Sequence, residues 1–288
     1  MRRALLLSAV LLLLPLGGCT ARQAVARATG TVVDDFLAAM NAEGDIPQAR
    51  GAAATLFVMI EGLLRADPAN EDLRRAAAQA YGSYAFAFLE EREPARAREF
   101  YRRGRDHGAA ALKARPGFGR AFEGEAAALR EALAALKEED LPLLFWTAYC
   151  WSGWVNLSRG DPDALADLPR AEAMMARALA LDRTFHHGGP DLFFGVYYGG
   201  RPPLLGGDPA KAKSHFERAL AATGGRFLMA KVLMARFLAV QTQDRALFEK
   251  LLKEVESAPE GLLPDQALAN ALARERARAL LKQAEELF

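Results

Sequence analysis

The histidines are the first side chains to consider, because a neutral imidazole binds metal ions and transfers protons near neutral pH. The sequence has four of them: His107, His186, His187 and His215. His186 and His187 are adjacent, and Asp191 follows shortly after them. Adjacent residues point to different sides of a helix, and no third ligand follows at a spacing typical of a zinc site. The pattern favours a polar loop before a helix, and we predict no metal site.

Phosphate binding and nucleophilic catalysis also lack their usual sequence signals. A phosphate-binding loop follows a strand and ends in Gly-Lys-Ser/Thr. The glycine-rich segment GGRPPLLGGD, residues 199–208, has neither feature. No serine lies in the Gly-x-Ser-x-Gly context of a nucleophile elbow. We therefore expect that the protein is not an enzyme and has no cofactor.

The remaining candidate side chains are aromatic. Eight residues are predicted to contact a ligand or a partner: Trp146, Tyr149, Trp151, Trp154, Phe193, Tyr197, Tyr198 and Arg201. The first four crowd one helical segment, and at 3.6 residues per turn they cannot all face one side. Packing in the core is the simpler interpretation. The functional alternative is a ligand groove with aromatic walls, in which Arg201 contacts an anion.

The cysteines indicate a lipid anchor instead of a disulfide bond. Two arginines and an apolar run precede Cys19, which is the pattern of a secretory signal and is too short to span a membrane. The sequence LGGC at Cys19 resembles the bacterial lipobox, in which the cysteine is diacylated and becomes the mature N-terminus. An ordinary signal peptide with a chance cysteine is the alternative. The only other cysteine is Cys150, so we expect no internal disulfide.

This pattern predicts a periplasmic, lipid-anchored protein. Several acyl chains, at about 0.8 kcal/mol per buried methylene, anchor a protein stably. Thr20 is not the Asp that resembles an inner-membrane retention signal, so the outer membrane is favoured. We predict a signal peptide at 1–18, a lipidated linker at 19–30 and one domain at 31–288. With 37 Lys+Arg against 36 Asp+Glu, the chain has no basic excess for binding nucleic acid.

The elements that carry these residues are predicted to be helices. Apolar residues recur at helical spacing, and no long segment alternates as a strand would. Small and aromatic residues such as Tyr81, Ala85, Ala97, Tyr101 and Gly104 fall at the offsets of the tetratricopeptide repeat. The same pattern returns further along the chain. We therefore predict an all-α fold, an array of tetratricopeptide-like helical hairpins with a C-terminal capping helix.

The sequence predicts where the helices of this array pair. Helix pairs are expected within 71–114, 143–183, 190–219 and 228–259, and a capping helix from about Pro264. In the third pair, Gly195 allows close approach, and Asp208 and Pro209 start the second helix as N-cap and first helical residue. Between them GGRPPLL forms a loop longer than a standard repeat turn, where we look first for a ligand or partner.

Several blocks occur in the order seen in a known family: the lipobox, YRRGRDHGAAAL, the tryptophan-rich helix, GGDPAKAKSHFERAL, QDRALFEKLLKEV and the closing LANALARERARALLKQAEELF. From about Cys19 to Phe288 the chain resembles the TatT family, the tetratricopeptide lipoproteins associated with tripartite ATP-independent periplasmic (TRAP) transporters. The turn at Gly206 to Asp208, with Ala212 and Phe216, is among the more specific parts.

The resemblance implies an accessory component of a transport system driven by an ion gradient. Such a protein forms a homotrimer and binds a periplasmic solute-binding protein, with a small hydrophobic or organic-acid ligand. Of the family's functional residues only Cys19 carries over, as the lipid site. The alternative is an outer-membrane scaffold that organises envelope proteins without a small-molecule ligand. A closed pocket at Tyr197, Tyr198 and Arg201 favours transport, whereas a flat exposed surface there favours a scaffold.

Overall fold

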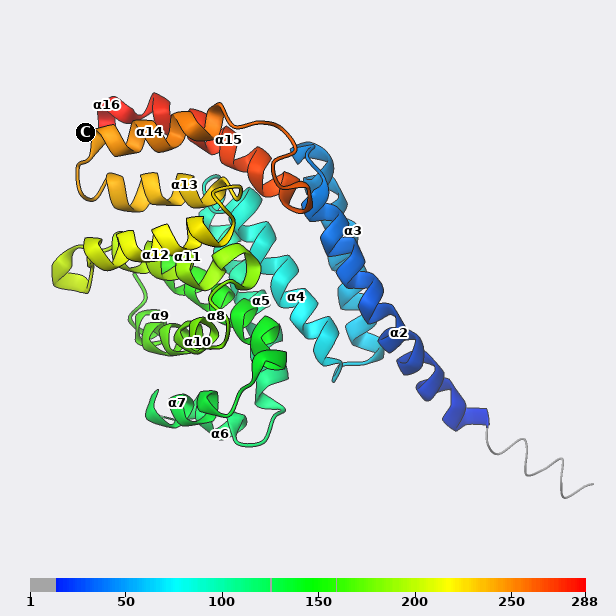
Figure 1. Ribbon diagram of the computed structural model, residues 1–288. Coiled ribbons are helices and arrows are strands. Elements are labelled where there is room, and N and C mark those ends of the chain that lie inside the picture. The colour runs from blue at the N-terminus through cyan, green and yellow to red at the C-terminus, as the bar shows by residue number, and fades with distance from the viewer. Residues whose placement is uncertain (1–13, 125, 159) are drawn as a thin grey trace, which may run out of the picture.

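The computed structural model describes residues 14–124, 126–158 and 160–288, and all regular elements in these ranges are helical (Figure 1). The predicted all-α fold is confirmed. The α-helices are α2 (Leu14–Ala42), α3 (Ile46–Ala66), α4 (Glu71–Tyr84), α5 (Pro94–Lys113), α6 (Phe118–Glu123), α7 (Ala126–Ala134), α8 (Leu141–Asn156), α9 (Pro162–Ala166), α10 (Leu168–Leu181), α11 (Phe185–Gly199), α12 (Pro209–Ala222), α13 (Met229–Met234), α14 (Arg245–Glu256), α15 (Ala267–Lys282) and α16 (Ala284–Leu287). Short 3₁₀ helices are η2 (Glu138–Asp140), η3 (Pro203–Leu205) and η5 (Pro264–Gln266).

The predicted helix pairs are present. α4 packs against α5, α8 against α10, α11 against α12, and α13 against α14. Their starts follow from local chemistry: Pro94 begins α5, and the Asp208 side chain accepts a hydrogen bond from the Lys211 backbone N–H at 3.0 Å to cap α12. The short helix α9 occupies the extra residues between α8 and α10.

Small residues allow these helices to approach each other closely. At Gly195 of α11, an added Cβ would lie 2.8 Å from the ring of Phe216 on α12, and this ring is fully buried. A polar contact also joins the two helices, since the buried Asp191 of α11 accepts a hydrogen bond from His215 of α12 at 2.7 Å. The close approach predicted for Gly195 is therefore confirmed.

The first turn of α11 is irregular. His186, His187 and Gly188 have φ angles of 45°, 60° and 80°, in the left-handed region that residues with a Cβ seldom adopt. The regular part of the helix starts after them, near Pro190, where a proline needs no partner for an N–H. His186 is held by an edge contact with Trp146, with ring centroids 4.7 Å apart.

Two helices of the array end in a π-helical turn. α4 continues into η1 (Ala85–Leu89) and α13 into η4 (Ala235–Ala239), each just before the second helix of its pair. Such turns are rare and frequently lie at functional sites. The sequence pattern predicted a helix at both places but not the change in winding.

The two ends of the array meet. α15 packs against α13 and α14, as a capping helix should, and also against α2 and α3 of the N-terminal hairpin, as Figure 1 shows. α2 and α3 pack against each other and against α4, burying side chains such as Val33, Leu37 and Ile60. The array is therefore closed on itself at this side.

The predicted lipid site lies at the edge of the described region. Residues 1–13 and the Cys19 side chain are outside it, and α2 passes through Cys19 as continuous helix. Among the described helices, none has both the length and the apolar character to cross a membrane. Lipidation of Cys19 and the boundaries 1–18, 19–30 and 31–288 stay predictions.

Candidate functional site

Two of the four aromatic residues predicted on α8 lie in the protein core. Trp146 is 4% exposed and Trp151 is 6% exposed. The Trp151 indole Nε1 donates a hydrogen bond to Asp167 at 3.1 Å, and its ring stacks on Phe122 with centroids 5.6 Å apart. Both tryptophans thus connect α8 to the neighbouring helices.

The other two, Tyr149 and Trp154, are half-buried where α8 packs against α5. Tyr149 meets Tyr101 edge to face, with ring centroids 6.1 Å apart, and burial raises the pKa of its hydroxyl well above the usual range. The guanidinium of Arg105 lies 4.3 Å from the centre of the Trp154 ring, a cation–π contact. These contacts explain both side chains as packing between two helices.

The second predicted group lies at the C-terminal end of α11. The Tyr197 hydroxyl donates a hydrogen bond to Glu172 at 2.7 Å, and burial together with this carboxylate raises its pKa to about 12. The Arg201 guanidinium lies 3.7 Å from the centre of the Tyr197 ring and donates to the Tyr197 carbonyl at 3.0 Å. Phe193 packs on the same ring. The structure brings Phe193, Tyr197 and Arg201 together.

Tyr198 points to the α12 side of the same helix. Its ring stacks near His215 of α12, with centroids 5.8 Å apart, and the Lys211 ammonium lies 5.2 Å from its centre. Its backbone carbonyl accepts a hydrogen bond from the Asp208 N–H at 3.0 Å. Tyr198 therefore fixes the end of the loop to the helix where the loop begins.

The loop between α11 and α12 presents two leucines to solvent. Leu204 is 98% exposed and Leu205 is 71% exposed, both within η3. The base of the loop is tightly built, because a Cβ at Gly207 would lie 1.8 Å from the Arg201 carbonyl oxygen. The same oxygen accepts a hydrogen bond from the Gln241 side chain. An anchored loop thus holds an apolar tip away from the body of the protein.

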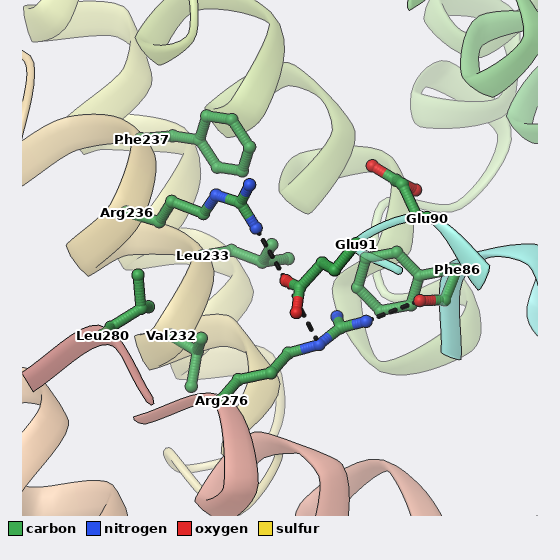
Figure 2. A pocket seen from close by; sticks show the side chains of 9 residues that line it. All are labelled: Phe86, Glu90, Glu91, Val232, Leu233, Arg236, Phe237, Arg276 and Leu280. Carbon is green, nitrogen blue, oxygen red and sulfur yellow. Dashed lines mark hydrogen bonds and ion pairs between the residues drawn. The ribbon is translucent and has the colours of Figure 1, made fainter. Parts of the chain in front are cut away.

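A narrow hollow that sequence reasoning missed lies between the two π-helical turns and α15 (Figure 2). Its apolar walls include Phe86 of η1, Phe237 of η4 and Leu280 of α15. Lining residues come from positions up to about two hundred residues apart in the chain. No local pattern marks them. A comparison of the two equivalent helix ends, in the first and the fourth pair, is the signal that could have indicated them.

One carboxylate lies between two guanidiniums in this hollow. The Glu91 Oε1 atom is 2.7 Å from Arg236 and 3.5 Å from Arg276 (Figure 2). Arg276 is mostly buried, lies 4.3 Å above the Phe86 ring and donates to the Phe86 carbonyl at 2.5 Å. Nearby, the Glu90 carboxylate accepts a hydrogen bond from Tyr101 at 2.6 Å. The hollow therefore joins the first helix pair to the last one electrostatically.

The free space in this hollow is small. Its volume is about 20 Å³, which suffices for about one water molecule. Glu91 already fills the space between the guanidiniums, so a larger molecule enters only if this side chain moves. In the conformation described, the hollow acts as a polar clasp between the ends of the array.

A comparison with protein families identifies the chain. The family model described as the TRAP transporter T-component, TAtT, matches residues 42–288, from the last residue of α2 to the end of the sequence. The chain belongs to this family. No curated protein matches it.

A T-component is an accessory part of a TRAP transport system and belongs to no known enzyme family. The match covers all the helix pairs of this T-component, together with the loop at Leu204 and the hollow at Glu91. It starts at the last residue of α2, so it does not include Cys19 or the rest of that helix. The resemblance to TatT proteins drawn from the sequence is confirmed.

Proposed function

We propose that this T-component is a periplasmic lipoprotein that binds the solute-binding protein of a TRAP transport system. Family membership supports the association with the transport system. The observation that carries the binding role is the loop tip, where Leu204 and Leu205 are 98% and 71% exposed on an anchored base. An apolar side chain held in this way gains free energy only when a partner covers it.

The loop suits a protein partner better than a small molecule. Tyr197 and Arg201 contact each other, and the Tyr197 hydroxyl donates a hydrogen bond to Glu172, so these side chains are already engaged within the protein. By the criterion set for these residues, a closed pocket favours transport and a flat exposed surface favours a scaffold; the exposed tip at Leu204 and Leu205 suits a protein partner under either role. The scaffold alternative therefore keeps support, because a scaffold also uses such a surface but carries no transported ligand.

The decisive experiment measures binding to the transport partner. The mature protein and a solute-binding protein of a TRAP system from the same cell are mixed, and complex formation is measured by isothermal titration calorimetry. We expect a complex with the transport partner. Failure to bind it, together with recovery of other envelope proteins by cross-linking in cells, would favour the scaffold.

The proposal has two further parts. Cys19 is acylated and attaches the protein to a membrane, and the identity of Thr20 favours the outer membrane. Globomycin treatment and mass determination of the mature N-terminus test this. The protein assembles as a homotrimer, which native mass spectrometry of the protein without its lipid tests together with any retained hydrophobic or organic-acid ligand.

A further inference from the structure

The N-terminal hairpin of α2 and α3 carries an exposed apolar surface. Four large side chains form it, and we call them the hairpin face: Val25 at 63% exposed, Val32 at 43%, Phe36 at 51% and Val58 at 75%. In the described residues the other large apolar side chains that stay exposed are Leu165, Leu204 and Leu205. The exposed apolar surface is thus concentrated on the hairpin and on the loop discussed above.

The side chains of the hairpin face lie on one side of each helix. Val25, Val32 and Phe36 are separated by seven and four residues, which places them in one row along α2. On α3, Gly51, Thr55, Val58 and Gly62 follow the same spacing and are all exposed. The side of α3 opposite its exposed row is buried, as Ile60 is, whereas the buried row of α2, which includes Val33 and Leu37, lies about 100° around the helix from the exposed row. The face is therefore the outer side of a packed hairpin.

One acidic side chain of each helix, Asp34 and Glu61, is drawn away from this face by an ion pair. Asp34 of α2 lies 2.6 Å from Arg75 of α4. Glu61 of α3 accepts hydrogen bonds from Tyr81 at 2.7 Å and Arg103 at 3.0 Å, on α4 and α5. Asp35 is exposed at the edge of the row. The row from Val25 to Phe36 holds no charged residue, and on α3 the exposed Arg65 follows the uncharged row from Gly51 to Gly62 at its C-terminal end.

We propose that the hairpin face lies on the surface of the phospholipid bilayer to which Cys19 attaches the chain. This inference rests on the proposed acylation of Cys19. α2 is continuous from Cys19 to the face, and at 1.5 Å per residue Val25 lies about 9 Å and Phe36 about 26 Å along the helix from the anchor. A helix held at one end by acyl chains brings the whole row to the membrane when it lies flat.

The composition of the face favours lipid over a protein partner. The side chains that dominate the binding energy of protein interfaces are Trp, Tyr and Arg. The hairpin face has none of these and consists of three valines and one phenylalanine separated by small residues. Because it has no basic row, its contact with the bilayer depends on apolar burial and not on anionic lipids. Phosphatidylcholine is therefore a sufficient probe.

Site-specific spin labelling tests the placement in the acylated mature protein. Single cysteines replace Val32 or Val58 on the face, and Ala38 or Leu205 as exposed controls outside it. Burial raises the pKa of the Cys150 thiol, so this residue does not compete for the label. The protein is reconstituted in phosphatidylcholine vesicles, and the accessibility of each nitroxide to oxygen and to a water-soluble nickel complex is measured.

We expect the labels at 32 and 58 to favour oxygen, as in the bilayer interface, and those at 38 and 205 to favour nickel. Equal nickel accessibility at all four positions would overturn the proposal. Dipolar broadening at position 32 that disappears on dilution with unlabelled protein would overturn it as well, because a second copy would then cover the face.

A partition measurement separates this proposal from the proposed lipid anchor. The mature chain with Cys19→Ala is added to the same vesicles, and the V32D/V58D double variant is compared with Ala38→Asp. We expect the partition coefficient of the double variant to fall about tenfold or more below that of the Cys19→Ala protein. The control should change little. Equal partitioning of both would contradict the inference. If mass determination finds an unmodified Cys19, the anchor is wrong, and this partition result still decides whether the face binds lipid.

Discussion

The loop between α11 and α12 offers the sharpest test of partner binding. In the L204D/L205D variant, two side chains that are 98% and 71% exposed become charged. Full burial of a leucine side chain contributes about 1.5–3 kcal/mol, and nearly all of the surface of these two is free to be covered. Their loss costs a complex about 3 kcal/mol, which corresponds to a dissociation constant raised about 100-fold or more.

The assay is isothermal titration calorimetry with the solute-binding protein of the same transport system. Leu165→Asp is the matched control, because Leu165 is also an exposed leucine, at 43%, in the short helix α9. The melting temperatures of both variants should stay near that of the wild type, since exposed side chains contribute little to folding. A dissociation constant within twofold of wild type for the double variant would refute the role assigned to the loop.

Three further predictions concern the stability of the array. Burial lowers the pKa of His186 to about 4, so between pH 6.5 and 4 only the unfolded chain takes up this proton. The free energy of unfolding, measured with urea, should therefore fall by about 2–3 kcal/mol as the pH is lowered through that window. His186→Asn, which tolerates the left-handed backbone, should flatten this pH profile, and an unchanged slope would contradict the assignment. Gly195→Val should lose about 2 kcal/mol to overlap with the Phe216 ring, and adding Phe216→Leu should recover part of it, whereas strictly additive losses would argue against direct contact. Arg276→Met should lower the free energy of unfolding by about 1–3 kcal/mol, because the Phe86 carbonyl and Glu91 lose this donor. The backbone amides of α15 should then exchange hydrogen faster, and protection equal to wild type would show that the clasp does not hold the ends together.

The sequence determined the parts of the fold that depend on neighbouring residues. Helical periodicity fixed the class, and a first-turn proline such as Pro94 or a cap such as Asp208 fixed where helices begin, because these signals act within one or two turns. The close helix approach at Gly195 followed from the repeat pattern, which restates one packing solution several times, whereas its contact with Phe216 came from the structure. The aromatic group at Tyr197 and the long loop between α11 and α12 could be predicted because they depart from that pattern.

Only the tertiary structure decided which of these residues are available for contact. Trp146 and Trp151 have the same sequence signal as an exposed aromatic pair, yet neighbouring helices bury both. The clasp at Glu91 joins it to Arg236, 145 residues away, and no local spacing announces such a pairing. The outer face of α2 and α3 likewise became evident only when α4 was seen to cover the other side. Periodicity indicates that a helix has an apolar and a polar side. Which residues on either side stay exposed depends on the elements that the rest of the chain packs against the helix.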